Sequence, residues 1–344
     1  MRDLSDYSGE GRAGFSSGFP STTAPASLSG PGPPRVSGRR LPAPRTPPPG
    51  ATLCPVSVSG PTRRTRTDMC PGVLRPWPAD DGALVRLRVP GGRVSPESLA
   101  ALHRVAASYG DDEVHVTTRA NLQLRALPMS RDGRLADEVV VAIAATGLLP
   151  APSHELVRNI LVSPLTGLVG GRTDLRPVTD RLDAGLRADP GLAGLSGRFL
   201  FVLDDGRGDL VDRPGDLGLA ALDAGTVQLR VGADWSAVTP LEEAADRLLD
   251  LARGFADARG SGPDASWHVR ELPVQLAAAC PGDGRLPTPA PALPYGPVPD
   301  SSGGIEHVGA PGGVLTGATI DRLTGDDVTE LIVTPWRGVL TVRT

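Results

Sequence analysis

The hydrophobic pattern is clearest at residues 83–89, where apolar and polar side chains alternate. Alternation with a period of two is typical of a strand with one buried face. The apolar positions of this segment are Val85, Leu87 and Val89. Arg86 and Arg88 fall on the opposite face, so we expect two arginines on the side of the sheet that faces away from the core.

The residues after this strand predict a turn, a helix, two strands and a second helix. Pro90-Gly91-Gly92 is typical of a turn, and Ser95 followed by Pro96 is typical of the start of a helix. The expected strands and second helix cover residues 113–117, 121–126 and 135–148. This order predicts an α+β fold, in which helices cover one face of an antiparallel sheet.

Polar side chains also gather on the outer face of the third strand. Arg119, Asn121, Gln123 and Arg125 share one parity, opposite to Leu122, Leu124 and Ala126. A solvent-exposed face is the simplest interpretation of such alternation. An arginine- and amide-bearing face is also a good receptor for a large polycarboxylate, because arginine pairs bidentately with carboxylates. The pattern alone leaves both interpretations open.

The same unit occurs a second time near the C-terminus. Pro311-Gly312-Gly313 precedes a short helix-like stretch and then LIVTPWRGVLTVR, at residues 331–343. An ungapped alignment with VHVTTRANLQLR, at residues 114–125, pairs Arg119 with Arg337 and Arg125 with Arg343. The repeat predicts a pseudo-symmetric pair of modules, with an arginine-bearing sheet in each and a site at their junction.

Between the two copies, the pattern predicts a mixed middle domain. Arg158-Asn159 precedes a buried-looking run. Helices are expected at 178–188 and 240–258, and strands at 198–204, 217–222 and 227–231. The predicted organisation is a disordered tail (1–67), a first half-domain (68–150), a middle domain (151–280), a Pro/Gly-rich linker (281–299) and a second half-domain (300–344).

Composition separates the tail from the rest of the chain. The 344 residues are 40% hydrophobic and 22% charged, with a net charge of −4, but residues 1–67 have almost no apolar periodicity and a net charge of +6. The tail's aromatic residues, Tyr7, Phe15 and Phe19, all precede most of its arginines, which makes nucleic-acid binding the weakest hypothesis. We find neither a secretory signal nor an apolar run that could span a membrane, and therefore expect a soluble, cytoplasmic protein.

The cysteines are too few for a metal centre. Cys54, Cys70 and Cys280 form no CxxC pair. An iron–sulfur cubane requires about four thiolates and a structural zinc about four Cys or His ligands. We therefore expect free thiols and assign no metal ligand.

Three segments resemble the nitrite/sulfite reductase family, and in particular its precorrin-3B synthase branch. They are Cys70–Gly92, Val114–Leu127 and Val157–Leu168. The resemblance covers residues 68–344 and implies two ferredoxin-like half-domains, paired around a pseudo-twofold axis, that embrace a tetrapyrrole or iron site.

The resemblance also implies a set of residues that bind the tetrapyrrole or anionic substrate. By their positions in the motifs they are Arg86, Arg119, Asn121, Gln123, Arg158, Asn159 and Arg198. Leu200 stands where sulfite reductases have a second basic residue, which favours the cobalamin-pathway branch. No catalytic residue is assigned. His115 shares the parity of Arg119, and either an ordinary polar-face histidine or a ligand of iron would suit that position.

The implied activity is oxygen-dependent hydroxylation of a precorrin macrocycle, with a [4Fe–4S] cluster and iron or siroheme as cofactors. In the family, the four cluster cysteines lie downstream of the second half-domain, whereas this sequence stops at Thr344. We therefore expect a truncated oxidoreductase, completed by a separate cluster-bearing subunit or electron donor. The alternatives are a cluster-less module that binds a tetrapyrrole or other anion without turnover, and a fragment like a sulfite or nitrite reductase.

Overall fold

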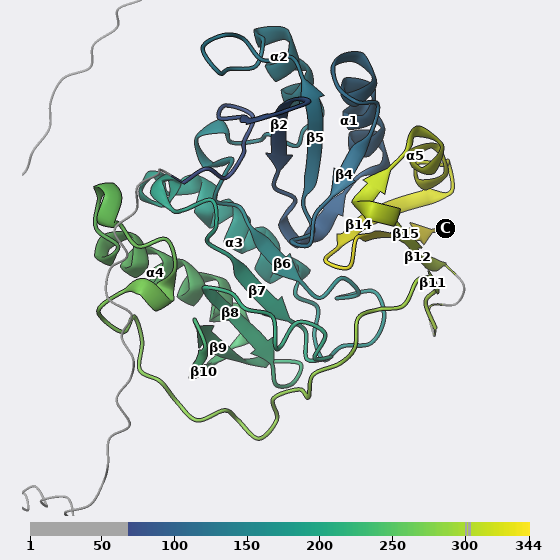
Figure 1. The fold of residues 1–344 in the computed structure, drawn as a ribbon. Coiled ribbons are helices and arrows are strands. Elements are labelled where there is room, and N and C mark those ends of the chain that lie inside the picture. Colours follow the sequence, from purple (N-terminus) through teal and green to yellow (C-terminus); the bar gives the residue numbers. More distant parts are fainter. Residues whose placement is uncertain (1–67, 300, 302–303) are drawn as a thin grey trace, which may run out of the picture. The chain divides into compact units, whose positions relative to one another are not determined.

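The computed structural model describes residues 68–299, 301 and 304–344 (Figure 1). The predicted disordered tail and Cys54 lie outside these ranges. Within the described ranges the chain forms three five-stranded sheets with helices packed against them, so the predicted α+β fold is confirmed. None of the helices in these ranges combines the length and apolarity that crossing a bilayer requires.

The first half-domain is an antiparallel sheet with two helices on one face. Its strand order is β1 (Trp77–Ala79), β2 (Gly82–Leu87), β5 (Leu122–Leu127), β4 (Val114–Val116) and β13 (Val314–Leu315). The helices are α1 (Pro96–Tyr109) and α2 (Asp137–Ala145). The predicted N-cap is confirmed, since Ser95 Oγ accepts a hydrogen bond from the Ser98 backbone N–H at 3.1 Å.

The apolar face of this sheet packs against α1 and α2 as the alternation predicts, with one exception. Val85, Leu122 and Leu124 are buried in the core. Ala126 has a left-handed φ of 53° beside a register shift in the β2–β5 pairing. This bulge moves the following residue inward, so Leu127 rather than Ala126 contributes to the core.

The second half-domain repeats this plan in shorter form. Its strand order is β11 (Gly296–Pro297), β12 (Ile305–Gly309), β15 (Gly338–Arg343), β14 (Val328–Thr334) and β3 (Arg93–Val94). Helix α5 (Gly317–Leu323) is capped by Thr316, whose hydroxyl accepts from the Thr319 N–H at 3.3 Å. Helix α5 packs against α1, so the two half-domains share one core (Figure 1).

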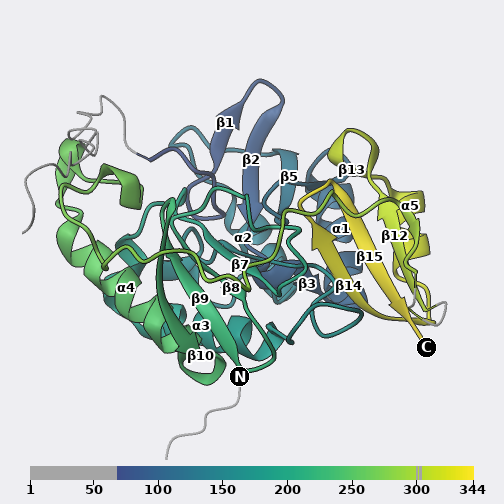
Figure 2. The ribbon, with the colours of Figure 1, turned by 90° about the horizontal axis from the view of Figure 1, so that it is seen from below.

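The two half-domains exchange one short strand each. Strand β3 comes from the first copy but pairs with β14, and β13 comes from the second copy but pairs with β4 (Figure 2). The Pro-Gly-Gly turn precedes the exchanged strand in both copies, with left-handed φ values at Gly92 (73°) and Gly313 (84°). A Cβ on Gly92 would overlap the carbonyl oxygen of Val333 on the opposite half-domain. The glycine allows both the turn and the close approach.

The structure corrects the alignment of the two copies by one residue. In one hairpin Val116 lies opposite Leu122, and in the other Val333 lies opposite Val339. The equivalent of Arg337 is therefore Ala120, not Arg119, and both residues have left-handed φ values, 54° at Ala120 and 59° at Arg337. The ungapped alignment was wrong because it matched the arginines, whereas the fold repeats the turn.

The outer faces of the two sheets consequently differ. On the first sheet, Arg86 and His115 lie opposite Gln123 on neighbouring strands. On the second, the equivalent strand positions are His307, Ile332 and Leu340. Ile332 and Leu340 are buried in an apolar cluster with Leu165 and Val298. The expectation of an arginine-bearing sheet in each copy is therefore wrong, because the second face is an apolar packing surface.

The middle domain is a mixed sheet with two helices. Its strand order is β10 (Asp234–Pro240), β9 (Thr226–Val231), β8 (Leu217–Ala221), β7 (Phe201–Asp204) and β6 (Ile160–Val162), and its helices are α3 (Arg176–Ala188) and α4 (Ala244–Ala258). Strands β6, β7 and β8 run parallel. The strand prediction missed β6 and β10.

The middle sheet lies between its own helices and the half-domain pair. Ile160 and Phe201 pack with α3 and α4, whereas the alternate residues Leu161 and Val202 belong to the core of the half-domains. A strand buried on both faces reads as a continuous apolar run, which is why β6 shows no alternation. This packing fixes the middle domain against the half-domain pair.

The strand exchange predicts a specific sensitivity at Gly92. Gly92→Ala introduces both a left-handed alanine and an overlap with Val333, so we expect it to lower the free energy of unfolding by about 2–4 kcal/mol. Gly133→Ala is the matched control, since Gly133 also has a positive φ (78°) but open space around its Cβ position, and about 1 kcal/mol is expected. Urea denaturation measures both, and equal losses would contradict the contact.

Candidate functional site

A cavity of about 660 Å³ lies where the β4–β5 loop of the first half-domain meets the middle domain. Five of the side chains that line it are arginines: Arg119, Arg198, Arg213, Arg230 and Arg270. One carboxylate, that of Asp216, also lines it. We call this cavity the arginine pocket.

The positive charge of the arginine pocket is not neutralised by its own wall. Asp216 accepts hydrogen bonds from the backbone N–H groups of Leu200 and Val269, each at 3.0 Å. Burial lowers the pKa of Arg213, and repulsion from Arg119 lowers it further. Burial also lowers the pKa of Arg230. Like charges held together in a cleft attract counter-ions, so this wall favours an anionic ligand.

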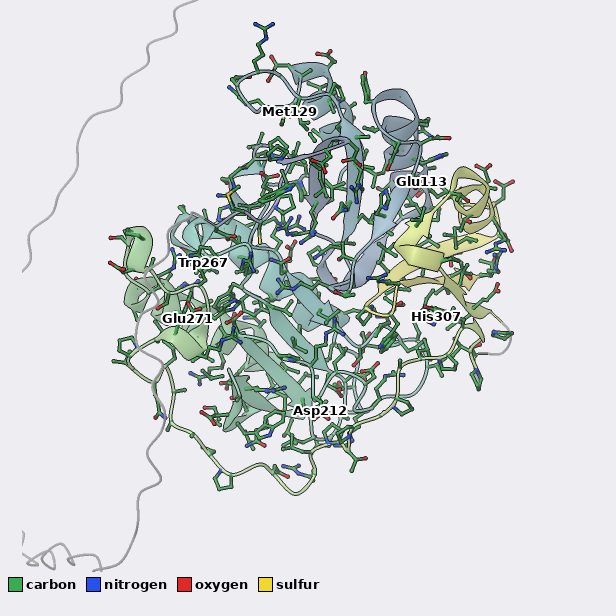
Figure 3. The ribbon with its side chains drawn as sticks, viewed as in Figure 1. Glu113, Met129, Asp212, Trp267, Glu271 and His307 are labelled. Atoms are coloured by element: carbon green, nitrogen blue, oxygen red, sulfur yellow. The ribbon has the colours of Figure 1, made fainter. Side chains whose placement is uncertain are left out.

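Backbone carbonyls and indole rings orient the arginines, and Arg198 Nε also lies 3.8 Å from Asp68 Oδ1, a carboxylate outside the pocket lining. Arg119 Nη1 donates to the carbonyl of Arg198 at 3.1 Å, across the boundary between the two domains. The guanidinium of Arg198 lies 5.4 Å from the ring centre of Trp267, on the middle domain (Figure 3), and that of Arg230 lies 5.7 Å from the ring of Trp235. These contacts orient the charged groups and leave their charge available to a ligand.

Two further arginines lie on β2 and just after it, outside the pocket lining but near enough to Arg119 for their charges to repel. Arg86 Nη2 donates to Gln123 Oε1 at 3.2 Å. Burial lowers the pKa of Arg86, and repulsion from Arg119 and Arg198 adds to the effect. Arg88 is 3% exposed, and burial together with Arg86 lowers its pKa to about 10. Within the described residues, Arg86 Nε and Arg88 Nη2 are buried without a hydrogen-bond partner.

The two asparagines of the motifs form the joint between the domains. Asn121 Oδ1 accepts from the Val89 N–H at 3.0 Å, and Asn121 Nδ2 donates to Asn159 Oδ1 at 3.3 Å. Arg88 Nε donates to the same Asn159 oxygen at 3.1 Å. Both asparagines are buried, and their side chains connect the first half-domain to the middle domain instead of lining the pocket.

Arg158 does not line the arginine pocket. Its Nε and Nη2 contact the two carboxylate oxygens of Asp183 at 2.6 and 3.0 Å, and Asp183 also pairs with Arg187. The side chain borders a separate hollow with Arg93 and Asp180. Of the residues predicted to bind the ligand, Arg119 and Arg198 therefore line the pocket. Arg86 and Gln123 form a hydrogen-bonded pair outside its lining.

Sequence reasoning missed Arg213, Arg230, Arg270 and His268, all of which line the pocket. Three of them lie in loops or turns, where no periodicity marks a shared face. Arg230 did have a signal, since alternation at 226–231 puts it on the same side of β9 as Gln228, opposite Val227 and Leu229.

The thiols of the described residues do not form an iron–sulfur cluster site. The cysteines in these ranges are Cys70, which is buried, and Cys280, which is exposed. Burial and the nearby Asp68 raise the pKa of the Cys70 thiol, which disfavours a thiolate ligand. A [4Fe–4S] cluster needs about four thiolates, so the residues that the structure describes do not fit one.

His115 belongs to a small cluster away from the pocket. Its Nε2 lies 2.9 Å from Asp111 Oδ2, and the ligand atoms of Asp111, Glu113 and His115 lie within 4.8 Å of one another. The histidine–aspartate hydrogen bond accounts for this arrangement without an ion. His115 does not line the arginine pocket.

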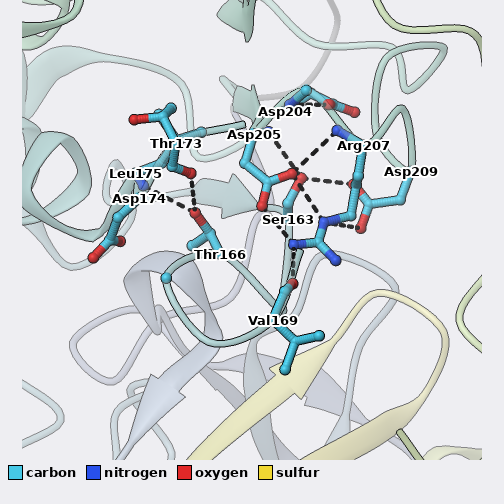
Figure 4. A network of polar contacts seen from close by, with 12 residues as sticks. Ser163, Thr166, Val169, Thr173, Asp174, Leu175, Asp204, Asp205, Arg207 and Asp209 are labelled. Carbon is cyan, nitrogen blue, oxygen red and sulfur yellow. Dashed lines mark hydrogen bonds and ion pairs between the residues drawn. The ribbon is translucent and has the colours of Figure 1, made fainter. Parts of the chain in front are cut away.

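A buried acidic network fixes the loops that follow β6 and β7 (Figure 4). Asp205 forms a bidentate ion pair with Arg207, and Asp209 accepts from Ser163 Oγ at 2.6 Å. Burial raises the pKa of Asp209 to about 7, and the charge of Asp204 adds to the rise. Asp204 accepts from three backbone N–H groups of its own turn, so the network positions the backbone.

The fold and the pocket together define a class: two ferredoxin-like half-domains with a middle domain, and an arginine-lined site at their joint. Residues 78–139 match the family described as nitrite/sulfite reductase ferredoxin-like half domain. This match assigns residues 78–139 to the ferredoxin-like half domain of that family.

Individual relatives agree with this assignment. The chain is 31% identical over 131 residues to a ferredoxin–nitrite reductase of Synechococcus elongatus, covering 36% of this chain and 25% of that protein. It is 30% identical over 152 residues to a precorrin-3B synthase of a Sinorhizobium species, covering 43% and 31%. The matches thus span about a quarter to a third of these relatives.

A solved structure shows the same fold. The NirA protein of Mycobacterium tuberculosis superposes with a TM-score of 0.51 at 14% identity, covering 76% of this chain and 54% of NirA. At this identity the likeness concerns the fold alone.

Arg158 is predicted to stabilise the fold. Arg158→Ala removes the main ion-pair partner of the Asp183 carboxylate. We therefore expect the free energy of unfolding to fall by about 3 kcal/mol. Arg119→Ala removes a charge that is repelled by its neighbours and should change stability by less than about 0.5 kcal/mol. Chemical denaturation compares them. A stability loss at Arg119 as large as that at Arg158 would contradict this division.

The raised pKa of Asp209 predicts a pH dependence of stability. The folded protein binds this proton more tightly than the unfolded chain does, where the ordinary pKa is 3.8. The resulting stabilisation is therefore fully present below about pH 4 and is lost as the pH rises to about 7, with an upper bound of about 4 kcal/mol. Asp209→Asn should remove this loss. If the difference in free energy of unfolding between variant and wild type stayed constant from pH 4 to 8, the role of Asp209 would be contradicted.

Proposed function

We propose that this chain binds an anionic tetrapyrrole in the arginine pocket, as part of an oxidoreductase of the precorrin-3B synthase type. The observation that carries the proposal is the charge of the pocket wall, with five arginines against the single carboxylate of Asp216. Arginine forks bind carboxylates bidentately, and a precorrin carries several carboxylates around its ring.

The size and wall of the pocket favour a macrocycle over a small anion. A volume of about 660 Å³ is in the range of cofactor-sized ligands and far exceeds what nitrite or sulfite would fill. Leu200 adds an apolar surface to the wall. At this position the sulfite reductases that the motif resembles have a basic residue, so the substitution favours a ring-bearing ligand over sulfite.

The arginines of the two domains would hold the ligand from different sides. Arg119 belongs to the first half-domain, and Arg198, Arg230 and Arg270 belong to the middle domain. Carboxylates bound from both sides fix the plane of a ring and the edge that it presents, which is the main contribution that positioning makes to catalysis. A precorrin substrate and a siroheme cofactor present the same carboxylates, and the same residues would bind either.

Redox chemistry is supplied by iron groups in this family, and the described residues do not fit a [4Fe–4S] cluster. We therefore assign no electron-transfer step to this chain. On this proposal, a separate cluster-bearing subunit or electron donor delivers the electrons.

The shortage of cysteines for a cluster also favours a second candidate, a binding module without turnover. Cys70 and Cys280 are the cysteines of the described ranges, too few for a cluster. Such a module would bind the tetrapyrrole through the same arginines and pass it on unchanged.

Binding of uroporphyrin, a metal-free tetrapyrrole with eight carboxylates, tests both candidates. Arg119→Ala and Arg198→Ala should each weaken binding by about 10- to 100-fold, since a charge-assisted hydrogen bond is worth about 1.5–3 kcal/mol. Fluorescence titration of the porphyrin measures the dissociation constant. Arg125→Ala is the matched control, because Arg125 is exposed on the same sheet and pairs with Asp81 at 3.0 Å. An equal loss in all three variants would overturn the proposed site.

A further inference from the structure

His268 stands out among the pocket residues because its ring is held by a buried carboxylate. Nδ1 lies 3.1 and 3.2 Å from the two carboxylate oxygens of Asp216. Asp216 is 4% exposed and is itself fixed by the backbone N–H groups of Leu200 and Val269. The imidazole lines the arginine pocket. The ring is therefore oriented from behind and has access to a ligand in front.

The backbone around His268 is fixed as well. Glu271 Oε2 accepts from the backbone N–H groups of Trp267 at 2.7 Å and His268 at 3.3 Å. The 3-10 turn Val269–Glu271 follows directly. Trp267, the residue before the histidine, lies against the guanidinium of Arg198. The histidine thus shares its support with one of the pocket arginines.

We propose that His268 is a ligand-binding residue of the pocket that carries a proton, and that Asp216 is its positioning residue. In the protonated form, the imidazolium binds a carboxylate of the anionic ligand. This inference rests on the proposed function, because it requires a polycarboxylate in the pocket.

Charged groups of both signs surround the ring of His268. The acidic groups are Asp216, which contacts the ring, and Glu271 on the following turn, which accepts from the His268 backbone N–H. The opposing groups are the five arginines of the wall: Arg119 from the β4–β5 loop, Arg198 before β7, Arg213 from the loop before β8, Arg230 from β9 and Arg270 from the 3-10 turn. In the free protein these cations repel a sixth positive charge.

A bound polycarboxylate cancels that repulsion. Its negative charges offset the arginines, whereas the attraction of Asp216 remains. Histidine is the side chain whose charge changes most readily between pH 5 and 8. Ligand binding can therefore change the protonation of His268 within this pH range. Binding should therefore be accompanied by proton uptake, and by linkage the affinity should fall as the pH rises.

Calorimetric titration with uroporphyrin tests this in two buffers of different ionisation enthalpy at pH 7.5. Wild type is expected to take up more protons per porphyrin bound than the porphyrin's own carboxylates account for. His268→Gln should reduce the uptake to that of the porphyrin's own carboxylates, measured separately, and weaken binding about tenfold at pH 6 but less than threefold at pH 8.5. Asp216→Asn should also reduce the proton uptake.

The control variant is His103→Gln. His103 also pairs with an aspartate, Asp112 at 3.2 Å, but lies on α1, and it does not line the pocket. It should retain the wild-type uptake and pH profile. Circular dichroism confirms folding, and if Asp216→Asn does not fold, His268→Gln carries the test.

The outcomes separate the two proposals. Tight porphyrin binding with the same proton uptake in wild type and His268→Gln would overturn the role of His268 and leave the arginine pocket intact. No porphyrin binding by wild type would overturn the proposed function and this inference with it.

Discussion

The reciprocal exchange of β3 and β13 is the interaction on which the described fold depends. Each half-domain completes its sheet with a strand from the other, so neither sheet is closed at that edge without its partner. The exchange brings α1 against α5 and merges their apolar residues into one core. It also fixes the β4–β5 hairpin, because β13 pairs with β4 directly. Arg119 owes its position to that hairpin.

The pocket is then created by docking the middle domain onto this pair. Apolar residues provide the attraction, since Leu161 and Val202 of the middle sheet are buried in the half-domains' core. The Asn121–Asn159 hydrogen bond sets the register across the joint. This docking forces arginines of two domains together and leaves Arg86 Nε and Arg88 Nη2 buried without partners within the described structure. Apolar burial must outweigh that electrostatic cost.

Local patterns predicted the elements well, because alternation, capping and glycine turns act within a few residues. The strand at 83–89, the Ser95 cap and helix α1 are all of this kind. Strand β6, which is buried on both faces, has no alternation and was missed. The pocket was only half predicted, because Arg213, Arg230 and Arg270 come together through the middle domain's topology. The repeat was recognised from its sequence but misaligned by one residue. The feature that the two copies share is a turn residue with left-handed φ, Ala120 in one and Arg337 in the other.

The asymmetry of the two sheets follows from what covers them. Both half-domains keep the geometry of the duplicated unit, but the outer face of the second is buried by Leu165, Val298 and their neighbours, and apolar residues are stable there. The outer face of the first meets the middle domain through polar groups, so charged residues persist at the joint. The two copies thus share one framework, and each outer face is apolar or polar in keeping with what packs against it. Within the described residues, the polar outer face of the first half-domain meets the middle domain beside the arginine pocket.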